Sequence, residues 1–269
     1  MLYFIGLGLF DEKDISIKGL ETLKSVDEIY AEFFTSKLFG SSIERIEELI
    51  GKKIAILNRQ EVEEENVFFK NAKNKNVALI TGGDPLIATT HTEFIVDAKE
   101  RGIDTEVVHS SSIISAAPGL SGLQAYKFGK VTTIPFPDYN YFPNSPYLAI
   151  LNNLKNDAHT LVLLDIQADK DRFMSINQGL KYLLQVRDKL VEENSNLNDL
   201  LINEETLAIG IARAGSKDKI IKAGKISELL DFDFGNPLHC IVIPSKLHIV
   251  EAEYLVKIAG ANESILDDL

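Results

Sequence analysis

Short apolar runs alternate with amphipathic stretches along most of the chain, and this alternation is the feature that most limits its possible folds. Such an alternation is typical of strand-helix-strand units, which build a parallel sheet covered by helices on both faces. In the N-terminal part we expect strands at residues 2–7, 27–32, 53–57, 77–81 and 104–108, and helices near 16–25, 42–50, 60–73 and 89–101. The sequence therefore predicts an α/β fold that begins with a parallel sheet.

The pattern changes after Val108, where a serine-rich link leads into an expected helix at residues 113–126. Residues 134–147 are rich in proline and aromatic side chains, which predicts an irregular segment that packs. A second series then follows, with strands near 159–165, 206–212 and 238–243 and helices near 146–155, 171–193 and 248–258. His248 is expected at the start of the last helix. We therefore predict two α/β lobes, residues 1–112 and 113–269.

Composition and charge exclude several classes of protein. With 269 residues, of which 45% are hydrophobic, the chain can bury a sizeable core. A net charge of −12 argues against broad contact with a nucleic-acid backbone. The apolar start at residues 1–7 lacks a basic flank and soon meets Asp11, so we interpret it as a strand and not as a signal peptide. No apolar stretch approaches the roughly 20 residues of a membrane span.

Cys240 is the one cysteine of the chain, which excludes an internal disulfide and a cysteine cluster for zinc. A lone cysteine suits a reducing setting, so we expect the protein to be cytoplasmic. Because Cys240 lies in an apolar run, we interpret it as a small buried hydrophobic residue and not as a nucleophile. The histidines show no spacing that is typical of metal ligands, and we expect no metal.

One stretch marks a candidate ligand site, the sequence Thr81-Gly82-Gly83-Asp84-Pro85-Leu86 directly after the apolar run at residues 77–80. A buried strand would end there in a turn that glycine tolerates best. Open α/β sheets hold their ligands beyond the carboxyl ends of the strands. The stretch therefore predicts a ligand site at the end of a strand.

A second candidate loop, Gly6-Leu7-Gly8-Leu9-Phe10-Asp11, follows the first expected strand. It partly matches a dinucleotide-binding fingerprint, and Glu32 lies at the spacing of a ribose-binding acid. The match fails because Asp11, Glu12 and Asp14 occupy the place where a helix N-terminus should bind a pyrophosphate. A turn that merely needs glycine is the alternative for this loop.

An acidic glycine loop suits a ligand that carries positive charge and no phosphate. S-adenosylmethionine has a sulfonium, an ammonium and an adenine, and it fits this description. The loop at residues 81–87 repeats the chemistry, because two glycines allow close approach and Asp84 adds a carboxylate. If the two strands are adjacent and parallel, both loops would border one cleft.

Several motifs resemble those of a known family. The glycine motifs and three further segments resemble the tetrapyrrole methylase superfamily: Ile17-Lys18-Gly19-Leu20, Gly83-Asp84-Pro85 and Ala212-Arg213-Ala214-Gly215-Ser216. Longer runs resemble its diphthine synthase branch: Tyr3-Phe4-Ile5-Gly6-Leu7-Gly8-Leu9, Ala31-Glu32-Phe33-Phe34-Thr35-Ser36, Asp84-Pro85-Leu86-Ile87-Ala88-Thr89-Thr90-His91, Tyr126-Lys127-Phe128-Gly129-Lys130 and Lys246-Leu247-His248-Ile249-Val250-Glu251-Ala252-Glu253-Tyr254-Leu255. The likeness runs from end to end.

The resemblance implies a two-lobed fold whose second lobe holds a mixed sheet, with S-adenosylmethionine bound in the cleft between the lobes and S-adenosylhomocysteine as product. The residues implied as cofactor contacts are Leu9, Asp84, Ile87, Ser112 and Ile113 in the first part of the chain, and Leu164, Ala214 and His239 in the second. Each has a structural alternative. Leu164 and Ile113 suit any core, Asp84 could cap the next helix, and His239 could be a satisfied histidine in a strand.

The activity implied by the resemblance is methylation of the amino group on a modified histidine of translation elongation factor 2, a step in diphthamide formation. A sulfonium is a good leaving group and the α-amino group has a pKa near 8, so positioning the two can supply much of the acceleration. We expect no catalytic side chain, although Asp11, Glu32 and Asp84 could hold positive charge. The resemblance also implies a homodimer and no contact with nucleic acid or membrane.

Three alternatives stay open. The chain could methylate a corrinoid precursor or ribosomal RNA, as other members of the superfamily do. It could also be a cofactor-binding module without catalysis.

The aromatic segment at residues 136–147 also has alternatives. It could contact the protein substrate, contact a partner subunit or form a packed cover between the lobes.

Overall fold

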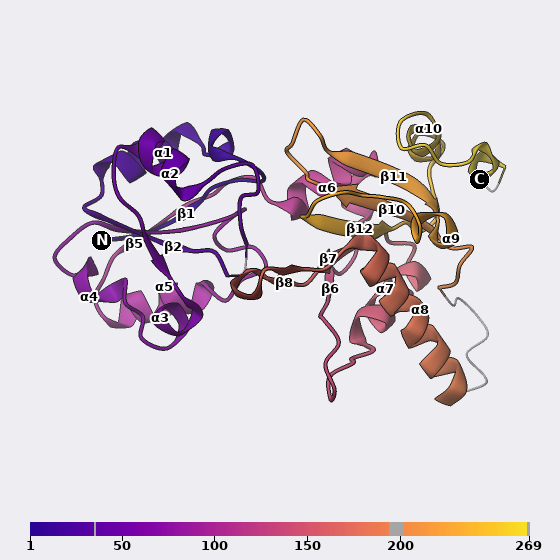
Figure 1. Cartoon of the computed structure of the whole chain (residues 1–269), viewed down its shortest axis with the longest axis horizontal. Coiled ribbons are helices and arrows are strands. Elements are labelled where there is room, and N and C mark those ends of the chain that lie inside the picture. The colour runs from indigo at the N-terminus through magenta and orange to yellow at the C-terminus, as the bar shows by residue number, and fades with distance from the viewer. Residues whose placement is uncertain (35, 194–201, 268–269) are drawn as a thin grey trace. The chain divides into compact units, whose positions relative to one another are not determined.

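The computed structural model describes residues 1–34, 36–193 and 202–267, so Thr35 of the motif at 31–36 lies outside the described residues. The chain divides into two compact units, which Figure 1 shows in one view. The first unit comprises Met1–Ile113 and Ile166–Arg172, and the second comprises Ile114–Asp165 and Phe173–Leu269.

The first unit is built on a five-stranded sheet in the order β3-β2-β4-β1-β5. Its strands are β1 (Leu2–Gly6), β2 (Glu28–Glu32), β3 (Ala55–Leu57), β4 (Val77–Thr81) and β5 (Thr105–Val108). Every pair in this sheet is parallel, and all five strands lie at predicted positions. The predicted parallel sheet is therefore confirmed.

Helices cover both faces of this sheet because alternate side chains of a strand point to opposite faces. They are α1 (Ile17–Ser25), α2 (Ile43–Ile50), α3 (Arg59–Glu63), α4 (Phe69–Ala72) and α5 (Thr92–Glu100). Ile5 and Ile80 pack in one buried cluster with residues of α1 and α2. Phe4 and Leu79 pack in another with residues of α3, α4 and α5. A sheet that is buried on both faces explains the continuous apolar runs of its strands.

Two predicted helices of this unit are shorter in the structure than in the prediction. The helix expected at 60–73 is split into α3 and α4, because Asn66 adopts the left-handed conformation with φ of 49°. The helix expected at 89–101 begins only at Thr92. Before it, the Thr89 hydroxyl accepts a hydrogen bond from the backbone N–H of His91 at 2.9 Å, a local turn that competes with helix.

The second unit is built on a mixed sheet in the order β11-β10-β12-β7-β6. Its strands are β6 (Thr132–Ile134), β7 (Thr160–Leu164), β10 (Leu207–Ala212), β11 (Ile220–Lys225) and β12 (His239–Ile243). β6 and β7 are parallel, whereas the other pairs are antiparallel. This arrangement confirms the mixed sheet that the resemblance implied.

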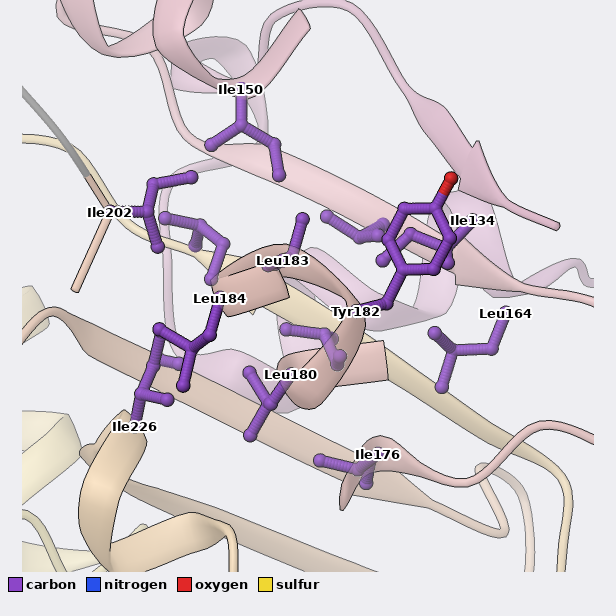
Figure 2. Packing of buried hydrophobic residues seen from close by; sticks show 14 of the residues in the cluster. Ile134, Ile150, Leu164, Ile176, Leu180, Tyr182, Leu183, Leu184, Ile202 and Ile226 are labelled. Carbon is purple, nitrogen blue, oxygen red and sulfur yellow. The ribbon is translucent and has the colours of Figure 1, made fainter. Parts of the chain in front are cut away.

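The helices of the second unit are α6 (Ile113–Ser121), α7 (Ser145–Lys155), α8 (Ile176–Glu193), α9 (Ile226–Leu229) and α10 (Ile249–Lys257). Figure 2 shows Leu180, Leu183 and Leu184 of α8 among the side chains that fill the core of this unit. His248 caps α10, as predicted, through its Nδ1 atom, which accepts from the backbone N–H of Val250 at 3.3 Å.

Other elements of the second half differ from the prediction. α6 ends at Ser121 and not near 126, because Gly122 adopts a left-handed φ of 71°. The helix expected from residue 171 begins at Ile176, because the preceding residues form a two-stranded ribbon of β8 (Ile166–Gln167) and β9 (Arg172–Phe173). β6, β11 and α9 were not predicted.

Cys240 of β12 is a buried member of this sheet, as the sequence predicted. Burial raises the pKa of its thiol to about 12, so the thiol stays protonated and is a poor nucleophile. We expect Cys240→Ala to leave the activity that the resemblance implies within about twofold of the parent and to cost on the order of 1 kcal/mol of stability. Loss of transfer in a variant that remains folded, measured by circular dichroism, would contradict this interpretation.

Candidate functional site

The loops after β1 and β4 are joined to each other by backbone hydrogen bonds. Gly6 is in register with Thr81 at the ends of the two parallel strands. Gly8 and Gly83 then donate to each other's carbonyl oxygens at 3.2 and 2.7 Å. The prediction that the two glycine loops follow adjacent parallel strands is therefore confirmed.

Two glycines of these loops are required for different reasons. A Cβ on Gly6 would collide with the carbonyl oxygen of Gly83 and would lie 2.8 Å from Cβ of Ser110, so the loops approach each other too closely for a side chain. Gly83 has a φ of 74°, a conformation that favours glycine, and a Cβ there would meet no atom within 4 Å. The backbone at Gly83 is therefore open to the approach of a ligand.

Asp84 ties the loop after β4 to the loop after β5. Its Oδ1 atom accepts from the backbone N–H of Leu86 at 3.0 Å. Its Oδ2 atom accepts from the backbone N–H of Ser110 at 3.1 Å and from His109 Nδ1 at 2.8 Å. Only 6% of Asp84 is exposed. It does not cap the following helix, which begins eight residues later, so its carboxylate serves to hold these two loops together.

The acidic residues of the first glycine loop mainly bind the loop itself. The Asp14 carboxylate accepts from the backbone N–H groups of Phe10 and Asp11 at 2.7 and 3.2 Å. The Asp11 carboxylate accepts from the backbone N–H of Lys13 at 2.9 Å. A hydrogen bond from Ser41 lowers the pKa of Glu12 below its ordinary value, so this carboxylate is ionised near pH 7. The loop is thus closed by its own carboxylates and stays negative.

The other implied contacts of the first part follow the same strand ends. Leu9 lies after β1 and is half-buried, and Ile87 lies after β4 and is exposed. Ser112 is buried in the loop after β5, and the half-buried Ile113 begins α6. Because β4, β1 and β5 are neighbours in the sheet, these residues and Asp84 all follow one edge of it.

The implied contacts of the second part also share one edge of their sheet. Leu164 ends β7, Ala214 follows β10, and His239 begins β12, whose residues pair with Ala212 and Leu163. The side chain of Leu164 is buried in the core, as Figure 2 shows, so a ligand could reach this residue mainly through its backbone.

The ring of His239 is fully engaged by backbone groups. Its Nδ1 atom accepts from the backbone N–H of Ile176 at 3.3 Å, so Nε2 carries the proton and donates to the carbonyl oxygen of Asn236 at 3.0 Å. These bonds hold the segment before β12 against the start of α8. The imidazole is therefore a satisfied group, and its contact with a cofactor stays a prediction.

Arg213 organises this edge, and sequence reasoning assigned it no role. Its backbone adopts a left-handed φ of 53° just before Ala214. Its guanidinium donates to the carbonyl oxygens of Phe234 and Asn236 at 2.6 and 2.7 Å, and to that of Asp218 at 2.9 and 3.1 Å. A single side chain thereby fixes both loops that flank Ala214 and His239.

Histidines make the stability of the fold depend on pH. Burial lowers the pKa of His91, His159 and His239, whereas an unfolded histidine titrates near pH 6.5. The folded chain therefore binds these protons less readily than the unfolded chain. The resulting stabilisation is complete above about pH 6.5 and is lost as the pH falls through the lower folded values. We expect a melting temperature several degrees lower at pH near 5.5 than near 7.5; an unchanged or higher value would contradict this.

The chemistry of the joined glycine loops fits S-adenosylmethionine better than a phosphate-bearing cofactor. The loops hold three carboxylates at residues 11–14, the buried Asp84 and only one basic side chain, Lys13. Such a charge would repel a pyrophosphate and attract a sulfonium or an ammonium. Within residues 1–34, 36–193 and 202–267, no group of acidic, histidine or cysteine side chains is arranged to hold a metal ion.

Comparison with known proteins gives consistent results along the whole chain. Residues 1–230 match the family model of the tetrapyrrole (corrin/porphyrin) methylases. The chain is 55% identical to a diphthine synthase of Methanothermobacter thermautotrophicus, over 99% of this chain and 98% of that protein. It is 53% identical to a diphthine synthase of Methanosphaera stadtmanae, over 100% of this chain and 99% of that one. A crystal structure of a diphthine synthase superposes with a TM-score of 0.85 at 38% identity, covering 100% of this chain and 99% of that chain.

Proposed function

Because the chain belongs to the tetrapyrrole methylase family and, within it, to the diphthine synthases, we propose that it methylates the modified histidine of translation elongation factor 2. The acceptor is the amino group of the 2-(3-amino-3-carboxypropyl) substituent on that histidine, and the product is diphthine. The chain is thus an S-adenosylmethionine-dependent methyltransferase of diphthamide biosynthesis. The observation that carries this proposal is the identity of 55% over 99% of the chain.

The edge of the first sheet is the proposed place of S-adenosylmethionine. The open backbone at Gly83 and the negative loops suit this ligand. We propose contacts from Leu9, Asp84, Ile87, Ser112 and Ile113 of the first unit, with further contacts from Leu164, Ala214 and His239 of the second. When bound, S-adenosylmethionine supplies a methyl group on a sulfonium, which is a good leaving group.

The residues of the chain then bind and orient the cofactor and the acceptor amino group, and none is required to remove a proton. The acceptor α-amino group has a reference pKa near 8, so a fraction of it is neutral at cellular pH. The thiol of Cys240 stays protonated, and the rings of His91, His159 and His239 contact backbone atoms at hydrogen-bonding distance. The carboxylates of the two loops favour a cationic product, which repeated methylation of one nitrogen creates.

The aromatic segment at residues 136–147 is the proposed contact with another protein. Its base packs, because the Phe142 ring lies 4.6 Å from that of Tyr182, whose hydroxyl donates to the carbonyl oxygen of Pro143. Its tip is a tight turn held by reciprocal backbone bonds of 3.0 Å between Asp138 and Tyr141, and it leaves Tyr139 97% exposed. Elongation factor 2 and a second copy of this chain are both proposed partners of this segment.

The cytoplasm is the proposed location of the protein. No helix within the described residues has the length and apolar character of a membrane span.

Transfer of a labelled methyl group tests the proposed function directly. The protein is incubated with labelled S-adenosylmethionine and with elongation factor 2 that carries the unmethylated precursor. We expect label on the factor, and mass measurement of the modified factor gives the number of methyl groups. Label on a corrinoid precursor or on ribosomal RNA instead would reject this substrate. Tight cofactor binding without any transfer would favour a binding module.

A further inference from the structure

Three polar side chains are buried together beneath the loop that follows β4. Glu32 ends β2, Thr81 ends β4, and His91 precedes α5. They are 0%, 2% and 4% exposed, so none of them lies on the surface where a ligand would approach. They are also outside the set of proposed cofactor contacts, and Thr81 and His91 flank Asp84 and Ile87 in the sequence.

Their contacts connect the strand ends to the loop. The Thr81 hydroxyl donates to Glu32 Oε1 at 2.9 Å. His91 Nδ1 lies 2.9 Å from the carbonyl oxygen of Pro85, which can only accept, so Nδ1 carries a proton. His91 Nε2 then faces Glu32 Oε1 at 3.5 Å. The imidazole therefore donates to the carbonyl of the residue after Asp84, and its other nitrogen lies beside the carboxylate at the end of β2.

Aromatic neighbours fix the plane of this imidazole. The ring of His91 stacks on Phe94 of α5, with centroids 5.5 Å apart and an angle of 26° between the planes. The ring of Phe4 of β1 also lies near the imidazole, and the centroids of the two rings are 6.5 Å apart. A ring that is held by packing presents its two nitrogens in fixed directions, toward Pro85 and toward Glu32.

The loop between Asp84 and His91 requires such support. Ala88 adopts a left-handed φ of 56°, which a residue with a Cβ rarely does. A conformation of this kind persists only where the surroundings determine it. A buried carboxylate is itself costly, and an apolar side chain would often serve stability as well. The arrangement thus favours a role in fixing one loop geometry.

We propose that His91 is a positioning residue that holds the loop of Asp84 and Ile87 in its cofactor-binding conformation. The proposal rests on the proposed function, because it takes those two residues as contacts of S-adenosylmethionine. His91 acts through its hydrogen bond to the Pro85 carbonyl, and it lies beside Glu32, which accepts from Thr81. Neither His91 nor Glu32 touches the cofactor.

The charge state of His91 agrees with its hydrogen bond to Pro85. Burial lowers the pKa of His91, against the opposing effects of Glu32, of the Pro85 carbonyl and of Glu63 on α3. Glu63 is itself paired with Arg59 at 3.0 Å. The imidazole is therefore mainly neutral near pH 7 and donates its one ring N–H to the Pro85 carbonyl. Nε2 carries no hydrogen, so it makes no hydrogen bond with the carboxylate of Glu32.

The affinity for S-adenosylmethionine, measured by calorimetry without any elongation factor, tests the proposal. His91→Ala removes the donor to Pro85, and we expect a dissociation constant about tenfold higher. At saturating cofactor the kcat should stay within about twofold of the parent, and the KM for elongation factor 2 should not change. A folded His91→Ala protein that binds the cofactor as tightly as the parent would overturn the proposal.

Conservative variants separate positioning from packing. His91→Asn can place a donor near the position of Nδ1, and it should restore most of the affinity, whereas His91→Gln should not. Ile103→Val, in the same buried cluster, is the packing control, and it should lower the melting temperature without changing the affinity. If the alanine variant fails to fold, equal affinities of the Asn, Gln and parent proteins would reject the proposal.

The same measurements distinguish this inference from the function on which it rests. A parent protein that binds S-adenosylmethionine but does not methylate elongation factor 2 would contradict the proposed substrate and leave the affinity comparison valid. A parent that does not bind S-adenosylmethionine would contradict the cofactor assignment and the positioning role together.

Discussion

Replacing Asp84 with alanine should weaken the binding of S-adenosylmethionine by about 10- to 100-fold, because hydrogen bonds to a charged group contribute about 1.5–3 kcal/mol. The buried carboxylate accepts from Leu86, Ser110 and His109, and it is the link between the loops after β4 and β5. Its loss would leave two backbone N–H groups without their partner and would free both loops. Titration calorimetry with S-adenosylmethionine measures the effect.

Two further variants divide the effect of Asp84 into its parts. Asp84→Asn keeps one acceptor oxygen and removes the charge, so an affinity as low as that of the alanine variant would assign the effect to charge. His109→Ala removes only the bond from a ring that is largely exposed, and we expect a change of no more than about threefold. An Asp84→Ala protein that folds and binds the cofactor within about twofold of the parent would contradict the assignment.

The strands that the sequence predicted well are those buried on both faces. Every residue of β4, Val77–Thr81, is buried, so its apolar run is continuous and its bounds are clear. β11 was not predicted because Lys222, Gly224 and Lys225 interrupt its apolar residues. It forms as the partner of β10 at the edge of the sheet, and that pairing is a tertiary contact. Pattern alone thus finds central strands more readily than edge strands.

Of the candidate site, the sequence predicted the two glycine loops at the strand ends and their negative charge. The partners of Asp84 were not predicted, although a signal for them exists. Because the carboxyl ends of parallel strands meet at one edge, His109 and Ser110 directly after β5 could have been expected near the loop that follows β4, two strands away in the sheet. The role of Arg213 could not be predicted in this way, because its acceptors are backbone carbonyls of residues 218–236, where no regular pattern places them.

A buried network around Glu251 in the second unit also escaped prediction, and it joins two of the family motifs through the pair of Lys127 and Glu251, 3.7 Å apart. Glu251 of α10 is 1% exposed and accepts from the backbone N–H groups of Gln124 and His248, each at 2.8 Å. His159 Nδ1 accepts from the backbone N–H of Ser245 at 2.9 Å, so Nε2 carries the proton and donates to Glu251 Oε1 at 3.2 Å. Burial acts to raise the pKa of Glu251, but these hydrogen bonds outweigh it and lower the pKa below its ordinary value.

Glu251→Ala should therefore destabilise the second unit by about 3–5 kcal/mol, the usual effect of removing one partner from a buried charged network. The substitution would leave the N–H groups of Gln124, His248 and His159 buried without their acceptor. Glu253→Ala on the same helix is the matched control, because its carboxylate forms only an exposed pair with Lys257 at 3.4 Å, worth at most about 0.5 kcal/mol. Urea denaturation followed by circular dichroism measures both. If the two variants lost similar stability, the network would contribute no more than a surface contact. Removing a buried acceptor of three N–H groups should lower the stability more than removing one partner of an exposed ion pair does.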